Sequence, residues 1–110
     1  MPMKPGFSKE QRSTARHNID ATLLGEHRTR GDLFLKLMNI SLDGFMLSDA
    51  DGLARGDRIT LRLPIAGYIE AFCSWEAGGR AGFQFERPIR VVEFPEVIAA
   101  LENRAECSLR

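Results

Sequence analysis

Alternation of apolar and polar residues is the feature of this sequence that most restricts its fold. In the segment RITLRLP, residues 58–64, the apolar side chains Ile59, Leu61 and Leu63 are spaced two apart. Successive side chains of a β-strand point to opposite faces, so this period predicts a strand with one buried face. The polar residues between them are then expected to face solvent.

Five further segments have the length and the apolar, β-branched or aromatic content of strands. They are residues 19–24, 33–41, 45–48, 68–76 and 80–86. Short polar or glycine-containing stretches separate them, and the last two are joined by Ala-Gly-Gly, a typical hairpin connection. The spacing therefore predicts consecutive strands with short turns.

The apolar period changes after the sixth strand. Phe94, Val97, Ile98 and Leu101 recur at three- and four-residue spacing, which predicts one face of a helix from about residue 91 to residue 105. Six short strands followed by one amphipathic helix predict an all-β fold, a six-stranded antiparallel β-barrel with a C-terminal α-helix.

The chain has 110 residues, which allows one domain with a single core. Residues 1–11 contain prolines, a glycine and polar residues without periodicity, so they are expected to form a flexible N-terminal arm. Residues 12–105 are expected to form the barrel and its helix, and residues 106–110 a tail.

Charge and hydropathy exclude several classes of function. The formal net charge is zero, whereas proteins that bind long nucleic acid usually carry a basic excess, so no DNA or RNA is expected. No apolar run approaches the roughly 20 residues of a membrane-spanning helix, and no secretion signal is apparent, so a cytoplasmic chain without a membrane span is expected. A small anionic ligand remains possible because it needs only two or three local cations.

The sequence does not predict an enzyme. It contains no nucleophile–base pair, no carboxylate dyad and no cluster of cysteine and histidine with metal-ligand spacing, so no catalytic residue, metal or cofactor is expected. Cys73 falls on the apolar side of residues 68–76 and is expected to be buried. Trp75, Phe83 and Phe85 are assigned to the barrel core rather than to a surface that stacks bases.

Two polar elements form the candidate site. Arg12 and Arg16 are four apart just before the first strand, and Asn39 and Ser41 are two apart in NISLDG, where an extended chain would direct both to one face. Gly44 allows tight backbone geometry or close approach of a ligand. A guanidinium fork pairs with phosphate oxygens and with guanine O6 and N7, whereas lysine cannot reproduce that planar geometry.

An Arg-x-x-x-Arg element followed by an Asn/Asp-x-Ser-x-x-Gly element resembles the PilZ domain family. Here Arg12 and Arg16 occupy the first element, and Asn39, Ser41 and Gly44 occupy the second. The segment FCSWEAGGRAGFQF is similar to the later strand pair of the family, so the resemblance covers about residues 12 to 86.

The resemblance implies a six-stranded barrel that binds the bacterial second messenger cyclic di-GMP. It implies that Arg12 and Arg16 bind guanine edges and phosphates, and that Asn39, Ser41 and Gly44 form the supporting wall. Gln11 departs from the many family members with a further arginine there, so this sequence lacks that charge.

The expected mechanism is a ligand that orders the arm on the barrel and changes the contact with an unidentified protein partner. The alternative is a protein–protein interaction module of the same fold that does not bind nucleotide.

Overall fold

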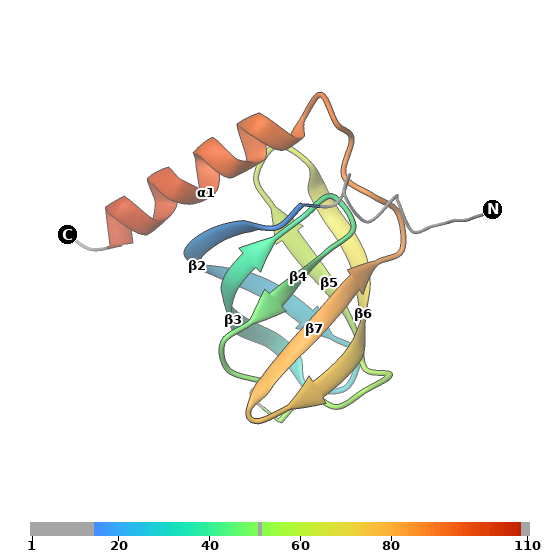
Figure 1. Ribbon diagram of the computed structural model, residues 1–110. Coiled ribbons are helices and arrows are strands. Elements are labelled where there is room, and N and C mark those ends of the chain that lie inside the picture. Colours follow the sequence, from blue (N-terminus) through green and yellow to red (C-terminus); the bar gives the residue numbers. More distant parts are fainter. Residues whose placement is uncertain (1–14, 51, 109–110) are drawn as a thin grey trace.

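Six antiparallel strands close into a barrel, and one helix lies across its end (Figure 1). The structure is a computed structural model that describes residues 15–50 and 52–108. Its elements are β2 (His17–His27), β3 (Gly31–Ile40), β4 (Gly44–Leu47), β5 (Arg58–Leu63), β6 (Gly67–Ala77), β7 (Arg80–Phe85) and α1 (Phe94–Ser108). The strand order around the barrel is β2-β3-β4-β7-β6-β5. The predicted all-β barrel with a C-terminal helix is confirmed.

Differences from the expected boundaries occur mainly at β2 and at α1. Strand β2 continues to His27 because Glu26 and His27 pair with Asp32 and Gly31 of β3, which gives a tighter hairpin than expected. Residues 91–93 form a turn, so the helix begins at Phe94. It then continues to Ser108, beyond the expected end at 105. The predicted arm, residues 1–11, lies outside the described residues.

The barrel interior is filled by the apolar positions of the alternating strands. Ile59, Leu61 and Leu63 of β5 are buried, as the alternation predicts. The rings of Phe45 and Phe83, register partners on the paired strands β4 and β7, stack with their centroids 5.1 Å apart and so hold the two strands together on the core side. Apolar burial of this kind is the main stabilising contribution to such a fold.

Trp75 is a correction to the predicted core. Its side chain is on the outside of the barrel, and the residue is 37% exposed. The pairing of β6 with β7 shifts register between Cys73 and Trp75, so that Cys73 pairs with Phe83 and Trp75 with Gly82. This bulge breaks the period of two, so Cys73 stays buried while Trp75 turns outward.

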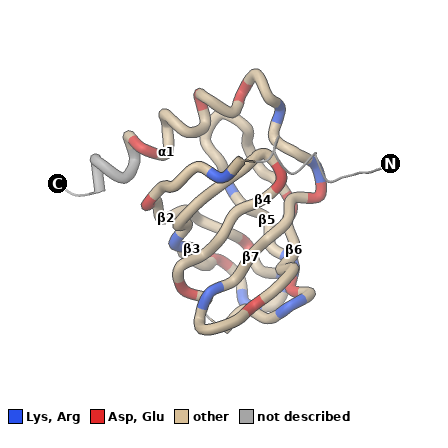
Figure 2. The backbone as a smooth tube through the Cα atoms, in the orientation of Figure 1, with Lys and Arg blue, Asp and Glu red and all other residues tan. Residues whose placement is uncertain are grey.

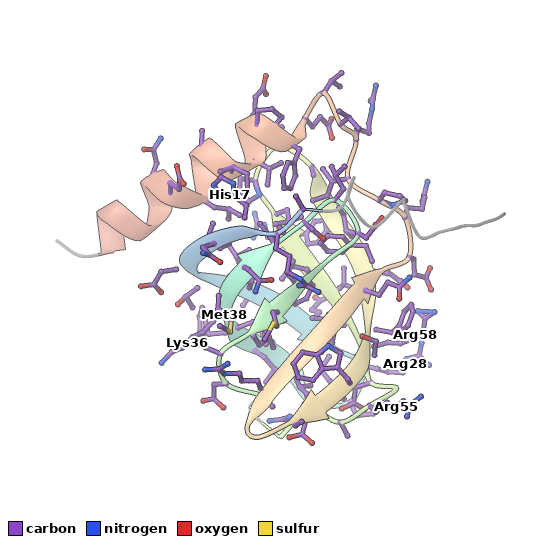
Figure 3. All side chains as sticks on the ribbon, viewed as in Figure 1. His17, Arg28, Lys36, Met38, Arg55 and Arg58 are labelled. Atoms are coloured by element: carbon purple, nitrogen blue, oxygen red, sulfur yellow. The ribbon has the colours of Figure 1, made fainter. Side chains whose placement is uncertain are left out.

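Helix α1 packs against β2, with Val97 and Leu101 fully buried. His17, at the start of β2, lies 3.4 Å from the Glu102 carboxylate of the helix (Figure 3). Within the described part of the chain, no helix is both long and apolar enough to span a membrane. Basic and acidic residues are interspersed around the tube in Figure 2, in keeping with the zero net charge.

Candidate functional site

Arg16 and Asn39 contact each other, although 23 residues separate them. The Arg16 guanidinium donates a hydrogen bond of 2.9 Å to Asn39 Oδ1. Pairing of β2 with β3 brings them together, because Asn18 and Asn39 are register partners. Arg16 is exposed and Asn39 is only 7% exposed. A guanidinium carries five N–H donors, and this hydrogen bond uses one of them.

The turn between β3 and β4 is held by its own hydrogen bonds. Ser41 Oγ accepts a hydrogen bond from the Asp43 backbone N–H at 3.2 Å and lies 3.4 Å from the carbonyl oxygen of Gly44, to which it donates. The Ser41 backbone N–H donates to the same carbonyl at 2.8 Å. Ser41 is 5% exposed. Its hydroxyl therefore already has partners within the turn.

Gly44 is required by the approach of β4 to β7. A Cβ atom at this position would lie 2.1 Å from the carbonyl oxygen of Phe83. Backbone cannot move away as easily as a side chain, so a larger residue would force the two strands apart. Of the two roles expected for Gly44, tight backbone geometry accounts for the glycine without a ligand.

These elements border a groove on the outside of the barrel, with a volume of about 590 Å³. Its lining comes from the residue before β2, the β3–β4 turn and strands β4, β6 and β7, and consists of Arg16, Ser41, Asp43, Gly44, Phe45, Ser74, Gly82, Phe83 and Gln84. Arg16 supplies the positive charge at this surface and Asp43 the negative charge, while Gln84 adds an amide. Such a groove can bind a polar ligand that has both acceptors and donors.

A row of side chains crosses four strands beside this groove. Asn39 pairs with Met46, Met46 with Gly82, and Gly82 with Trp75. The Asn39 side-chain amide donates to the Met46 sulfur at 3.4 Å. A Cβ atom on Gly82 would lie 2.0 Å from Trp75 Nε1, so the indole lies directly over the glycine. The row joins the polar Arg16–Asn39 pair to an apolar, aromatic surface.

The structure brings together most of the predicted site. Arg16, Ser41 and Gly44 line one groove, and Asn39 contacts it through Arg16. Arg12 lies outside the described residues. Sequence reasoning missed Asp43 and the other polar lining residues of the groove, because they come from a turn and from β6 and β7.

Sequence reasoning also missed the outward position of Trp75. The available signal was the pair of glycines and the tryptophan in SWEAGGRAG, which marks a hairpin but does not show the bulge.

Burial also alters one ionisable group behind the groove. Cys73, on the inner face of β6, is 1% exposed, and burial raises the pKa of its thiol above the ordinary value of 9.0. Its Sγ donates to the carbonyl oxygen of Trp75 at 3.2 Å. The neutral thiol is therefore a core group, consistent with the expected burial.

No protein-family model matches the chain, and the search of curated proteins found no match. The groove and the residues that surround it are therefore the features that indicate a function.

Proposed function

We propose that this chain is a PilZ-like receptor that binds cyclic di-GMP in the groove beside Arg16 and signals through a protein partner. The observation that carries the proposal is the hydrogen bond between Arg16 and Asn39. It brings one residue from each of the two motif elements together at the edge of a groove that Ser41 and Gly44 also line. Neither element would form a site alone.

The charge and polarity of the groove suit a guanine nucleotide. The Arg16 guanidinium can pair with guanine O6 and N7 or with a phosphate oxygen, in each case through charge-assisted hydrogen bonds. The Asp43 carboxylate accepts hydrogen bonds, and the amino group of guanine donates them. The Asp43 carboxylate also repels the two phosphate groups of cyclic di-GMP. The proposal therefore requires the second arginine, Arg12, to balance the phosphate charge.

The aromatic surface beside the groove provides a place for a base. Trp75 lies over Gly82 and is 37% exposed, and Gly82 itself lines the groove. Stacking of a base on an aromatic ring contributes about 1–3 kcal/mol. In this proposal Arg16 recognises the polar edge or phosphate of the nucleotide, and the indole contributes to binding through its face.

Calorimetric titration of the full chain with cyclic di-GMP tests the proposal directly. We expect binding that Arg16→Ala weakens about 10- to 100-fold, because hydrogen bonds to a charged group contribute about 1.5–3 kcal/mol. Arg12→Ala is expected to weaken it similarly. Arg28→Ala is the matched control, since this arginine lies on another part of the barrel (Figure 3) and should leave affinity unchanged.

A second titration with GTP separates recognition of the cyclic dinucleotide from general attraction of guanine nucleotides. Equal affinity for both would contradict a dedicated receptor. No binding of either at millimolar ligand, by the folded chain, would instead support the alternative, an interaction module of the same fold. The internal hydrogen bonds of Ser41 and the close strand approach at Gly44 favour that alternative, because they explain both residues without a ligand.

A further inference from the structure

The Asp43 carboxylate lines the groove and extends from a backbone that is fixed on both sides. Asp43 lies half-buried in the β3–β4 turn. Its backbone N–H donates to Ser41 Oγ at 3.2 Å, and its carbonyl oxygen accepts from the Phe85 N–H at 2.8 Å. Among residues 15–50 and 52–103, whose side chains are described, no hydrogen bond or ion pair involves its carboxylate. Both carboxylate oxygens can therefore accept hydrogen bonds from a ligand.

The other polar groups at this groove are mostly engaged within the protein. The hydroxyls of Ser41 and Ser74 donate to backbone carbonyl oxygens at 3.4 and 3.2 Å. Arg16 donates to Asn39 Oδ1 at 2.9 Å, and in the part of the chain with described side chains it forms no ion pair with Asp43. The groove therefore presents a cation and an anion that do not neutralise each other by direct contact.

A carboxylate at this place is unfavourable for an anionic ligand unless donors of that ligand meet it. Like charges repel, so Asp43 lowers the affinity for phosphate groups. A charged acceptor also forms stronger hydrogen bonds than a neutral one, so the same carboxylate raises the affinity for an edge that carries N–H groups. In a nucleotide, that edge belongs to the base.

Guanine and adenine differ at the edge that a carboxylate would meet. Guanine carries N1–H and a 2-amino group side by side, so the two carboxylate oxygens can each accept one hydrogen bond. Adenine carries an unprotonated N1 and a C2–H there, so the carboxylate would face a lone pair and lose hydrogen bonds to water without replacement. A site rejects an analogue strongly when binding leaves one of its polar groups unpaired.

We propose that Asp43 makes this groove selective for guanine over adenine, by accepting hydrogen bonds from N1–H and the 2-amino group of one base. The inference rests on the proposed function and adds the residue that selects the base. Arg16 can pair with a phosphate or with a base, whereas Asp43 pairs only with donors. Asp43 occupies an x position between Ser41 and Gly44 of the Asn/Asp-x-Ser-x-x-Gly element, so the motif spacing does not single it out.

Calorimetric titration of the full chain with cyclic di-GMP, cyclic di-IMP and cyclic di-AMP tests the inference. The base of cyclic di-IMP is guanine without its 2-amino group. We expect cyclic di-IMP to bind about tenfold more weakly than cyclic di-GMP, and cyclic di-AMP about 100-fold more weakly. Asp43→Ala should bring the affinities for cyclic di-GMP and cyclic di-IMP to within about twofold of each other. The ratio is the readout, because loss of the carboxylate also removes its repulsion of the phosphates.

Asp32→Ala is the matched control, because Asp32 lines a different cavity, beside Arg28, and should leave the ratio unchanged. If Asp43→Ala keeps the full preference for cyclic di-GMP over cyclic di-IMP, the inference is overturned while the receptor function stands. If the folded original chain binds none of the three ligands, the proposed function fails and the inference with it. Thermal unfolding of each variant establishes that it is folded.

Discussion

The β3–β4 turn and Arg16 border the same groove, but they differ in how many of their hydrogen-bonding groups have partners within the protein. Ser41 and Gly44 are held by hydrogen bonds inside the turn and by the close approach of β4 to β7. Arg16 is exposed, and its hydrogen bond to Asn39 uses one of the five N–H donors of the guanidinium. The turn residues Ser41 and Gly44 therefore form a wall of the groove, whereas Arg16 presents a guanidinium that can bind a ligand.

This difference shows that residues in one sequence motif can be required for different reasons. Substitution of the turn residues is expected to lower stability whether or not a ligand exists. Substitution of Arg16 is expected to affect binding far more than stability. Measurements of both quantities on the same variants can therefore separate architecture from recognition.

The largest effect is expected at the wall. Gly44→Ala should lower the free energy of unfolding by about 3 kcal/mol or more, because the new methyl group would lie 2.1 Å from the Phe83 carbonyl oxygen. Urea denaturation measures the change. Gly31→Ala is the control: Gly31 has a φ of 76° but open space around it, so only backbone strain of about 1–2 kcal/mol is expected. Equal losses would contradict the close-approach argument.

A smaller loss is expected from the turn hydroxyl. Ser41→Ala should cost about 1–2 kcal/mol in urea denaturation, because the Asp43 backbone N–H loses its acceptor. Ser41→Thr keeps a hydroxyl and provides the comparison. An alanine variant as stable as the original chain would show that solvent replaces this hydrogen bond. Ser41 would then be a residue whose hydroxyl can bind a ligand without loss of stability.

The buried thiol behind the groove should make stability fall at alkaline pH. Burial raises the pKa of Cys73 above 9.0, so the unfolded chain loses this proton at lower pH than the folded chain does. The unfolded state then binds fewer protons, so stability should fall from pH 9 to pH 10. Urea denaturation at both pH values should show a smaller loss for Cys73→Ala. An unchanged loss would assign the effect to other groups.

The smallest stability effect is expected at Arg16. Arg16→Ala should cost at most about 1 kcal/mol, because water from the open groove can replace the guanidinium at Asn39 Oδ1. Urea denaturation beside Arg28→Ala measures this. A loss as large as that of Gly44→Ala would erase the distinction between wall and binding group, and would make Arg16 a structural residue.

The sequence predicted the strands because their burial follows a simple period. Alternation in residues 58–64 and the Ala-Gly-Gly turn were sufficient to place β5 and the β6–β7 hairpin, in which Gly78 and Gly79 both have positive φ. The period could not place Trp75, since a bulge depends on how two strands pair and leaves no local pattern. The groove was also predicted only in part: Asp43 and Gln84 reach it through a turn and through β7.

Strand order also determines how the chain can reach this fold. β2, β3 and β4 form one meander and β5, β6 and β7 another, each built from neighbours in sequence. The pairings β2–β5 and β4–β7 then join the two meanders over longer separations, and β2–β5 aligns only Gly25, Glu26 and His27 with their partners. Each meander alone leaves half of the shared core in water, so neither should persist by itself. Folding should therefore be a single cooperative event in which the two meanders become stable together, with the short β2–β5 pairing as the last region to be protected from hydrogen exchange.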